Sequence, residues 1–243
     1  MEFEDDAFVL SARAHGETGA IVELITARHG KYAAHVAGAA SRRIKPFLQA
    51  GARVLFSYRA RTSDQLGAAT LEPVGEGPSA LFDDRPALAG LASAAAVAAG
   101  ALPEREPHPG AYLGFEALLA VLAAPDIWPA VYVRFEAGLL ADLGFGLDLS
   151  KCAVTGALDN LIYVSPRTGR AVSAEAGADY AARLLALPPF MLSAQGGLRP
   201  GDVGAGLTLT AHFLERFVFS PLNRPLPPAR HWLVDRLSEA ERL

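Results

Sequence analysis

The segment GAASRRIKPFLQAG, residues 38–51, places three cationic side chains within four positions. These are Arg42, Arg43 and Lys45, and small or apolar residues flank them on both sides. Guanidinium and ammonium groups neutralise phosphates and release condensed counterions, which gives affinity for a nucleic acid with little sequence preference. The cluster therefore predicts contacts to a nucleic-acid backbone.

The cluster belongs to a longer cationic segment. The chain has a formal net charge of -4, yet residues 24–63 contain no Asp or Glu. Their cations are Arg28, Lys31, Arg42, Arg43, Lys45, Arg53, Arg59 and Arg61. The local distribution of charge, more than the net charge, determines where a polyanion is attracted. We expect these side chains to form one cationic track on the folded surface.

Three aromatic residues, Tyr32, Phe47 and Tyr58, accompany these cations in the sequence. Aromatic rings stack on unpaired bases in proteins that bind single strands. However, RVLFSYRAR, residues 53–61, alternates so that Tyr58 shares a strand face with Val54 and Phe56. Core packing therefore explains Tyr58 equally well, and both interpretations stay open.

Common enzyme signatures are absent from the sequence. It has no G-x-x-x-x-G-K-[ST], G-x-G-x-x-G or G-x-S-x-G motif, and its six histidines lack paired metal-ligand spacing. His212 and Glu215 would share a helix face, which leaves an undetected enzyme site there as an alternative to an ordinary surface pair. The single cysteine, Cys152, cannot form an internal disulfide and has no identifiable base. We predict neither catalysis nor a cofactor.

Short strands with turn residues between them must position the cations. Five such strands in about 70 residues are typical of an OB-fold barrel, although an SH3-like barrel has a similar pattern. The predicted strands cover residues 7–12, 20–27, 31–38, 53–61 and 66–74.

A segment rich in Gly, Pro and Asp, residues 74–86, separates this pattern from helical spacing. We place the domain boundary here, with an OB-fold DNA-binding domain at 1–79 and an all-α domain at 80–243. Asp84 and Asp126 are predicted to cap two helices. An insertion at 147–177 contains a predicted β-hairpin, which makes the fold class α+β. Further helices are expected at 111–124, 178–187, 205–219 and 228–240.

The composition indicates a soluble globular protein, with 51% hydrophobic and 20% charged residues. The longest uncharged apolar run, residues 88–102, is mostly alanine and shorter than the roughly 20 residues of a membrane span. The N-terminus, MEFEDDAF, lacks the basic and apolar regions of a secretory signal. We expect a cytoplasmic protein, and the predicted nucleic-acid contacts would associate it with the nucleoid.

Several motifs together resemble those of the bacterial recombination mediator RecO family. They are V-L-S at 9–11, G-E-x-x-x-I-V at 16–22, H-G-K at 29–31, GFGLDLSKCAVTG at 144–156, YVSPRTGRAVS at 163–173 and FVFSPLNRPLPPAR at 217–230. The resemblance spans nearly the whole chain. It implies binding to single- and double-stranded DNA, strand annealing, and cooperation with RecR in loading RecA onto DNA coated with single-strand-binding protein (SSB), without covalent chemistry.

Many members of that family carry a C-x2-C…C-x2-C zinc module in the helical domain. The matching positions here are Cys152, Thr155, Ser173 and Ala176. Tetrahedral zinc requires four nitrogen, sulfur or carboxylate ligands. We therefore predict a degenerate module without metal, held together by hairpin pairing and packing.

The residues outside the cationic segment are acidic overall, which would leave the helical domain free for protein partners. The SSB tail is acidic and apolar, and a helix groove with a basic rim would accept it. Candidates for that rim are Arg216, Arg224 and Arg230, although ordinary surface arginines would give the same pattern. The main alternative function is that of an OB-fold RNA-binding protein with a helical appendage and no mediator role.

Overall fold

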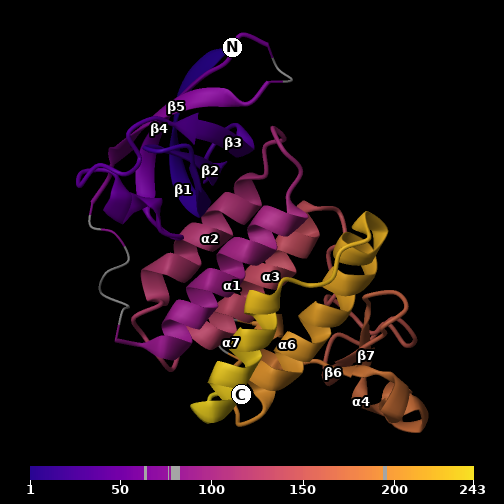
Figure 1. Ribbon diagram of the computed structural model, residues 1–243. Helices are drawn as coiled ribbons and strands as arrows, with labels where there is room; N and C mark the ends of the chain where they lie inside the picture. The colour runs from indigo at the N-terminus through magenta and orange to yellow at the C-terminus, as the bar shows by residue number, and fades with distance from the viewer. Residues whose placement is uncertain (63–64, 76, 78–82, 194–195) are drawn as a thin grey trace.

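A β-barrel sits at one end of a helical bundle, and a small sheet lies on the far side of that bundle, as the computed structural model shows (Figure 1). The structure describes residues 1–62, 65–75, 77, 83–193 and 196–243. The predicted α+β class and the barrel followed by helices are confirmed. The boundary between residues 79 and 80 lies outside the described residues, so the division into domains stays a prediction.

The barrel closes in the order β1-β2-β3-β5-β4, with β4 pairing back onto β1. Neighbouring strands are antiparallel except β3 and β5, which pair in parallel. This arrangement confirms the OB-fold among the barrels that fit the sequence. The strands are β1 (Glu2–His15), β2 (Gly19–Thr26), β3 (Gly30–Val36), β4 (Arg53–Arg59) and β5 (Gly67–Pro73).

Strand β1 begins five residues before its predicted start, because its two halves pair with different neighbours. Residues 2–8 pair with β4, residues 7–15 pair with β2, and the register shifts between Val9 and Ser11. Glu2 lies opposite Arg59, so the acidic start of β1 faces a cationic strand end. Opposite charges across a strand pair stabilise the pairing, which explains why a segment as polar as MEFEDD is extended.

Within the described residues, five long helices form the bundle, and among them α1 contacts α2, α3 and α7. The Asp84 carboxylate accepts a hydrogen bond from the Ala87 amide (3.0 Å) and caps α1 as predicted. Asp126 does not cap α3, which begins after Ile127. No helix in the described ranges is both long enough and apolar enough to span a membrane. These helices are α1 (Arg85–Ala101), α2 (Pro109–Val121), α3 (Trp128–Asp142), α6 (Asp202–Phe213) and α7 (Pro228–Glu239).

The insertion forms the predicted hairpin, in which β6 (Leu161–Val164) pairs with β7 (Ala171–Ser173). The helix expected at 178–187 is wrong. Residues 174–183 form two short helical turns, α4 (Ala174–Gly177) and η3 (Ala178–Arg183), and β8 (Leu185–Ala186) then pairs with the other edge of β6. Residues 185–187 form backbone hydrogen bonds with β6. Their polar backbone groups are therefore satisfied without the hydrogen bonds of a local helix.

The barrel is fixed to the bundle by shared core and by buried polar contacts. Phe8, Leu10 and Ile25 belong to the same apolar cluster as the helices. Lys31 is 8% exposed, and its Nζ donates to the Ala99 carbonyl near the end of α1 (2.6 Å). Gly30 has φ +84°, and a Cβ there would lie 1.9 Å from the Glu106 carbonyl oxygen. The connection between α1 and α2 therefore packs closely against the turn between β2 and β3.

A buried polar network joins four helices inside the bundle. Arg230 of α7 donates from Nε to Glu136 Oε1 (3.1 Å) and from Nη2 to Glu136 Oε2 (3.0 Å). Thr210 of α6 and Tyr132 of α3 also donate to this carboxylate, at 2.5 and 2.8 Å, and Tyr132 OH lies 2.6 Å from Ser93 Oγ of α1. Burial raises the pKa of Tyr132 well above its usual value, so it stays a neutral donor.

Candidate nucleic-acid interface

The connection between β3 and β4 carries the predicted cation cluster. Arg42, Arg43 and Lys45 are all exposed. The connection is folded by its own backbone, since Ser41 N donates to Gly38 O (3.0 Å) and Lys45 N donates to Ser41 O (3.0 Å). Within the described part of the chain, no carboxylate forms an ion pair with these three side chains. Their charge is therefore free to attract an anion.

A cavity of about 280 Å³ separates this connection from the β1–β2 turn. Arg13 of β1 and Lys45 both line it, together with mostly small residues and one carboxylate, Glu17. The Ala40 amide donates to the Thr18 carbonyl (3.1 Å) and holds the two segments together. Arg13 was not among the predicted residues, because it lies outside the cation-rich segment and one residue beyond the predicted end of its strand. We call Arg13, Arg42, Arg43 and Lys45 the basic loop surface.

Other predicted cations are engaged by carboxylates. Arg28 Nε lies 3.1 Å from Asp5 Oδ1, although the arginine side chain is still 69% exposed. Arg53 bridges Asp6 (3.5 Å) and Glu116 of α2 (3.3 Å). Such partners reduce the charge that a phosphate would meet.

Arg59 lies 3.8 Å from Glu2, while Arg61 is exposed beyond the end of β4. Lys31 is buried between barrel and bundle, so the expectation that all eight cations share one surface track is wrong for it. The charge pattern alone does not reveal this burial, because the partner of Lys31 is 68 residues away in sequence.

The buried carboxylate of Asp5 in β1 is hydrogen-bonded to the turn between β2 and β3. It is 2% exposed and accepts hydrogen bonds from Arg28 N (2.8 Å), Arg28 Nε (3.1 Å) and His29 Nδ1 (2.7 Å). Burial raises the pKa of Asp5, but the hydrogen bonds from His29 and Arg28 outweigh it and lower the pKa below its usual value. Asp5 therefore stays ionised and fixes the β2–β3 turn.

The aromatic residues considered for base stacking belong to the barrel core. Tyr32 and Tyr58 are 2% and 1% exposed, and their rings meet edge to face with centroids 5.0 Å apart. Phe47 is half-buried against the same core. The packing interpretation of Tyr58 is thus the correct one, and Tyr32 is equally inaccessible to a base.

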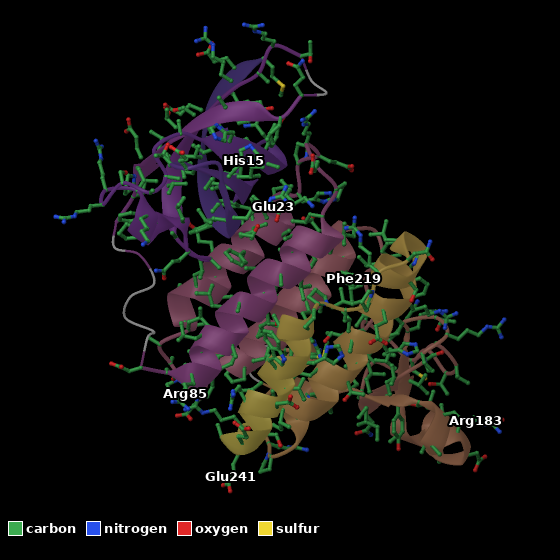
Figure 2. All side chains as sticks on the ribbon, viewed as in Figure 1. His15, Glu23, Arg85, Arg183, Phe219 and Glu241 are labelled. Atoms are coloured by element: carbon green, nitrogen blue, oxygen red, sulfur yellow. The ribbon has the colours of Figure 1, made fainter. Side chains whose placement is uncertain are left out.

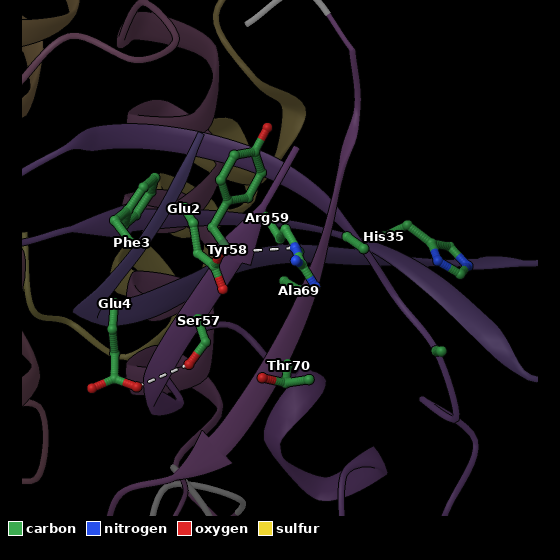
Figure 3. A pocket seen from close by; sticks show the side chains of 11 residues that line it. Glu2, Phe3, Glu4, His35, Ser57, Tyr58, Arg59, Ala69 and Thr70 are labelled. Atoms are coloured by element: carbon green, nitrogen blue, oxygen red, sulfur yellow. Dashed lines mark hydrogen bonds and ion pairs between the residues drawn. The ribbon is translucent and has the colours of Figure 1, made fainter. Parts of the chain in front are cut away.

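A second hollow, of about 580 Å³, opens on the barrel where β1, β4 and β5 meet (Figure 3). Glu2 and Glu4 line it, and Glu4 accepts a hydrogen bond from Ser57 Oγ (3.0 Å). Arg59 also lines the hollow, but it is paired with Glu2. Because these carboxylates would repel phosphate, the hollow is a poor site for a nucleic-acid backbone.

A groove of about 580 Å³ lies between α6 and α7. Apolar side chains such as Leu207 and Val234 line it. Its polar and charged lining residues are Thr208, His212, Glu215, Arg230 and His231. His212 Nε2 hydrogen-bonds the Pro166 carbonyl (2.9 Å), so that nitrogen is already engaged and an enzyme site with Glu215 has no support.

The predicted rim arginines differ in their placement. Arg216 and Arg224 are exposed, and Arg216 Nη1 donates to the Pro166 carbonyl (3.0 Å). Arg230 is 5% exposed with its guanidinium bound to Glu136, so the expectation that it forms part of an exposed rim is wrong.

The four positions that match the zinc module come together, but their donors do not fit zinc. Cys152 Sγ accepts a hydrogen bond from Ser173 N (3.3 Å), and Ser173 Oγ accepts one from Ala176 N (3.4 Å). Burial raises the pKa of the Cys152 thiol, but hydrogen bonds from Ser173 and Thr155 lower it to about 6. Among the described residues, no three His, Cys, Asp or Glu side chains are grouped to hold a metal.

Comparisons with known proteins cover both parts of the chain. The family model "Recombination protein O N terminal" matches residues 1–74, and "Recombination protein O C terminal" matches residues 83–225. A DNA repair protein RecO from Phenylobacterium zucineum is 77% identical over the full length of both chains. One from Caulobacter vibrioides is 74% identical, also over both full lengths. Another from Rhodospirillum centenum is 48% identical over 99% of this chain and 96% of its own.

Proposed function

The chain belongs to the RecO family of DNA repair proteins, and from this premise we propose that it is a recombination mediator. In this role it binds and anneals DNA and helps RecR to load RecA onto single-stranded DNA coated with SSB. The observation that carries the proposal is the basic loop surface, where three exposed cations lack carboxylate partners in the described structure and a fourth, Arg13, lines a cavity together with Lys45.

DNA binding on the basic loop surface follows from electrostatics. Arg13 and Lys45 line a cavity with one carboxylate, and Arg42 and Arg43 are exposed on the same connection as Lys45. Each phosphate contact releases counterions from the nucleic acid. Arg28, Arg59 and Arg61 are exposed as well, and carboxylates partly neutralise the charges of Arg28 and Arg59. Such contacts do not read base sequence, as a protein that acts wherever repair is needed requires.

Annealing has a physical basis in the same surface. Two strands repel each other through their phosphates, and bound cations reduce that repulsion over distances comparable to the Debye length of about 10 Å at 0.1 M salt. Holding both strands on one protein also raises their effective concentration. No covalent step is required.

The groove between α6 and α7 is the proposed site for the SSB tail. Its apolar lining suits the hydrophobic end of that tail, and His231 offers a donor to its carboxylates. Arg216 and Arg224 are candidates for long-range electrostatic attraction of the tail, whereas Arg230 binds Glu136 and so fixes α7 to α3. Val234→Glu should abolish binding of a labelled tail peptide, and Trp232→Ala, on the neighbouring exposed part of α7, should not. Equal binding by both variants would exclude the groove.

DNA binding is tested by reversing charge at the basic loop surface. The variant R42E/R43E should bind a fluorescent single-stranded oligonucleotide at least about tenfold more weakly at 0.1 M salt. Its plot of log affinity against log salt should flatten by about 1.4, because each lost phosphate contact on a single strand removes roughly 0.7.

The matched control is R85E/R183E, which makes the same change in net charge at two exposed arginines of the helical domain (Figure 2). Its affinity and salt slope should stay close to those of the unmodified protein. Equal affinities and slopes for both double variants would contradict the assignment of the basic loop surface.

The RNA-binding alternative is separated from the proposal by competition. Single-stranded RNA and DNA of one sequence are titrated against the same labelled oligonucleotide, and annealing of complementary DNA strands is followed by fluorescence transfer. A clear preference for RNA together with no acceleration of DNA annealing would favour the alternative.

A further inference from the structure

Three phenylalanine rings form a parallel column that runs from the core of the helical domain to solvent. Phe213 is 1% exposed, Phe217 is partly buried, and Phe145 is 40% exposed. The Phe213 and Phe217 centroids lie 6.0 Å apart with an interplanar angle of 9°. The Phe217 and Phe145 centroids lie 5.4 Å apart, also at 9°. The outermost ring of the column, Phe145, therefore stacks on Phe217 with one face and is partly exposed to solvent.

The outer ring is held in place by the β6–β7 hairpin. Phe145 lies on the connection after α3, and Asp148 on that connection donates its amide to the Gly169 carbonyl (3.0 Å). The Ala171 amide donates to the Asp148 carbonyl in return (2.9 Å). Phe217 is carried by η4 (Leu214–Phe219), which continues α6. An exposed aromatic ring on such a braced segment loses little freedom when a ligand covers it.

A cationic side chain, Arg216, lies against this column. The Arg216 guanidinium lies 5.3 Å from the Phe217 centroid, and its hydrogen bond to the Pro166 carbonyl (3.0 Å) places it beside the hairpin turn. That turn also carries Arg167, which is exposed. The nearby carboxylates are Asp148, which pairs with Arg170 (3.3 Å), and exposed Glu215.

We propose that Phe145 is a base-stacking platform for single-stranded nucleic acid, with Arg216 and Arg167 contacting the adjacent phosphates. A flat aromatic face next to guanidinium groups suits an unpaired base and its backbone. An acidic peptide is the less suitable occupant, because it needs a concave apolar pocket, and the nearby concave feature is the α6/α7 groove. That the strand is DNA rests on the proposed function.

This platform is separate from the basic loop surface. The β6–β7 hairpin lies on the opposite side of the bundle from the barrel (Figure 1). One protein thus has a surface for a DNA backbone on the barrel and a second surface that accepts only unpaired bases. Annealing brings together two single strands, and the second surface would release its strand once the bases pair.

The test compares Phe145→Ala with Phe145→Trp in the R42E/R43E background, where binding through the barrel is weakened. Phe145→Ala should weaken binding of an oligothymidine at least about fivefold, because a stacked base contributes that much or more. Phe145→Trp should restore the affinity, and binding of a duplex should change less than about twofold. Tyr180→Ala, which removes another exposed aromatic ring (58% exposed), is the matched control and should change neither.

Three outcomes would overturn the inference. The first is equal oligothymidine affinity for Phe145→Ala and its parent. The second is equal loss of duplex and single-strand binding. The third is loss of SSB-tail peptide binding without loss of oligonucleotide binding, which would make Phe145 a peptide contact. None of these changes the separate result for R42E/R43E in the otherwise unmodified chain, so the proposed function is judged independently.

Discussion

At the scale of single residues, Asp5 links stability to pH. Its folded-state pKa is lowered, so the folded protein releases this proton more readily than the unfolded chain does. The resulting stabilisation is present above the unfolded-state value of about 3.9 and is lost as the pH falls toward the lower folded-state value.

Asp5→Asn should therefore lower the free energy of unfolding by about 1–3 kcal/mol at pH 7, because donors from Arg28 and His29 lose a charged acceptor. The difference from the unmodified protein should shrink as the pH falls below about 4. Urea denaturation at pH 7, 4 and 3 measures both effects. A difference that is independent of pH would show that the Asp5 charge does not matter.

The Glu136–Arg230 pair is the second feature at this scale. Glu136→Ala leaves a buried guanidinium without its carboxylate and should lower the free energy of unfolding by about 3–5 kcal/mol. The double variant E136M/R230M removes both charges and should cost clearly less than the single change. Denaturant unfolding, monitored through buried Trp128, provides the comparison. If the double variant lost as much as the single variants E136M and R230M together, the charges would not be coupled.

At the scale of elements, the β6–β7 hairpin should be stable without metal. A chelator should leave the melting temperature of the protein unchanged, because Cys152 is the one thiolate among the four matching positions. The triple variant T155C/S173C/A176C supplies four thiols at those positions and should bind one zinc ion with tetrahedral thiolate coordination. Elemental analysis and chelator-sensitive melting measure this. Stoichiometric zinc in the unmodified protein would contradict the prediction.

Elements with a clear local pattern could be predicted from the sequence. Alternation located the barrel strands, and Asp84 located the start of α1. The first half of β1 and the strand β8 could not be predicted, because pairing with distant strands makes them extended against their local composition. The residues of the candidate site show the same contrast between local pattern and distant contacts. Arg42, Arg43 and Lys45 could be predicted from their clustering, whereas the burial of Lys31 and Arg230 depends on contacts 68 and 94 residues away.

At the scale of the whole molecule, barrel and bundle should unfold together, because Phe8, Leu10 and Ile25 of the barrel lie in the core of the helices. Gly30→Ala should lower the melting temperature strongly, since the new Cβ would meet the Glu106 carbonyl at 1.9 Å. Gly38→Ala is the matched control, because its φ is also positive (+64°) but the space around it is open. It should cost only the roughly 1–2 kcal/mol of a left-handed residue.

Calorimetry measures the predicted cooperativity. The unmodified protein and Gly38→Ala should each show one transition, and Gly30→Ala should show an earlier or separate melting of the barrel. Similar losses for both glycine variants would show that the contact with Glu106 does not hold the barrel in place.

The hydrogen bond from the Lys31 ammonium to the Ala99 carbonyl restricts movement of the barrel against the bundle, which bears on the proposed function. A barrel fixed to the bundle keeps the length of the path between the α6/α7 groove and the basic loop surface constant. Consider a protein that is bound to DNA and carries a flexible tail. If the segment that links its tail to its DNA-bound part is shorter than that path, the tail cannot occupy the groove while the same DNA is bound to the barrel. The fold would then impose an order of events, in which one ligand departs before the other arrives.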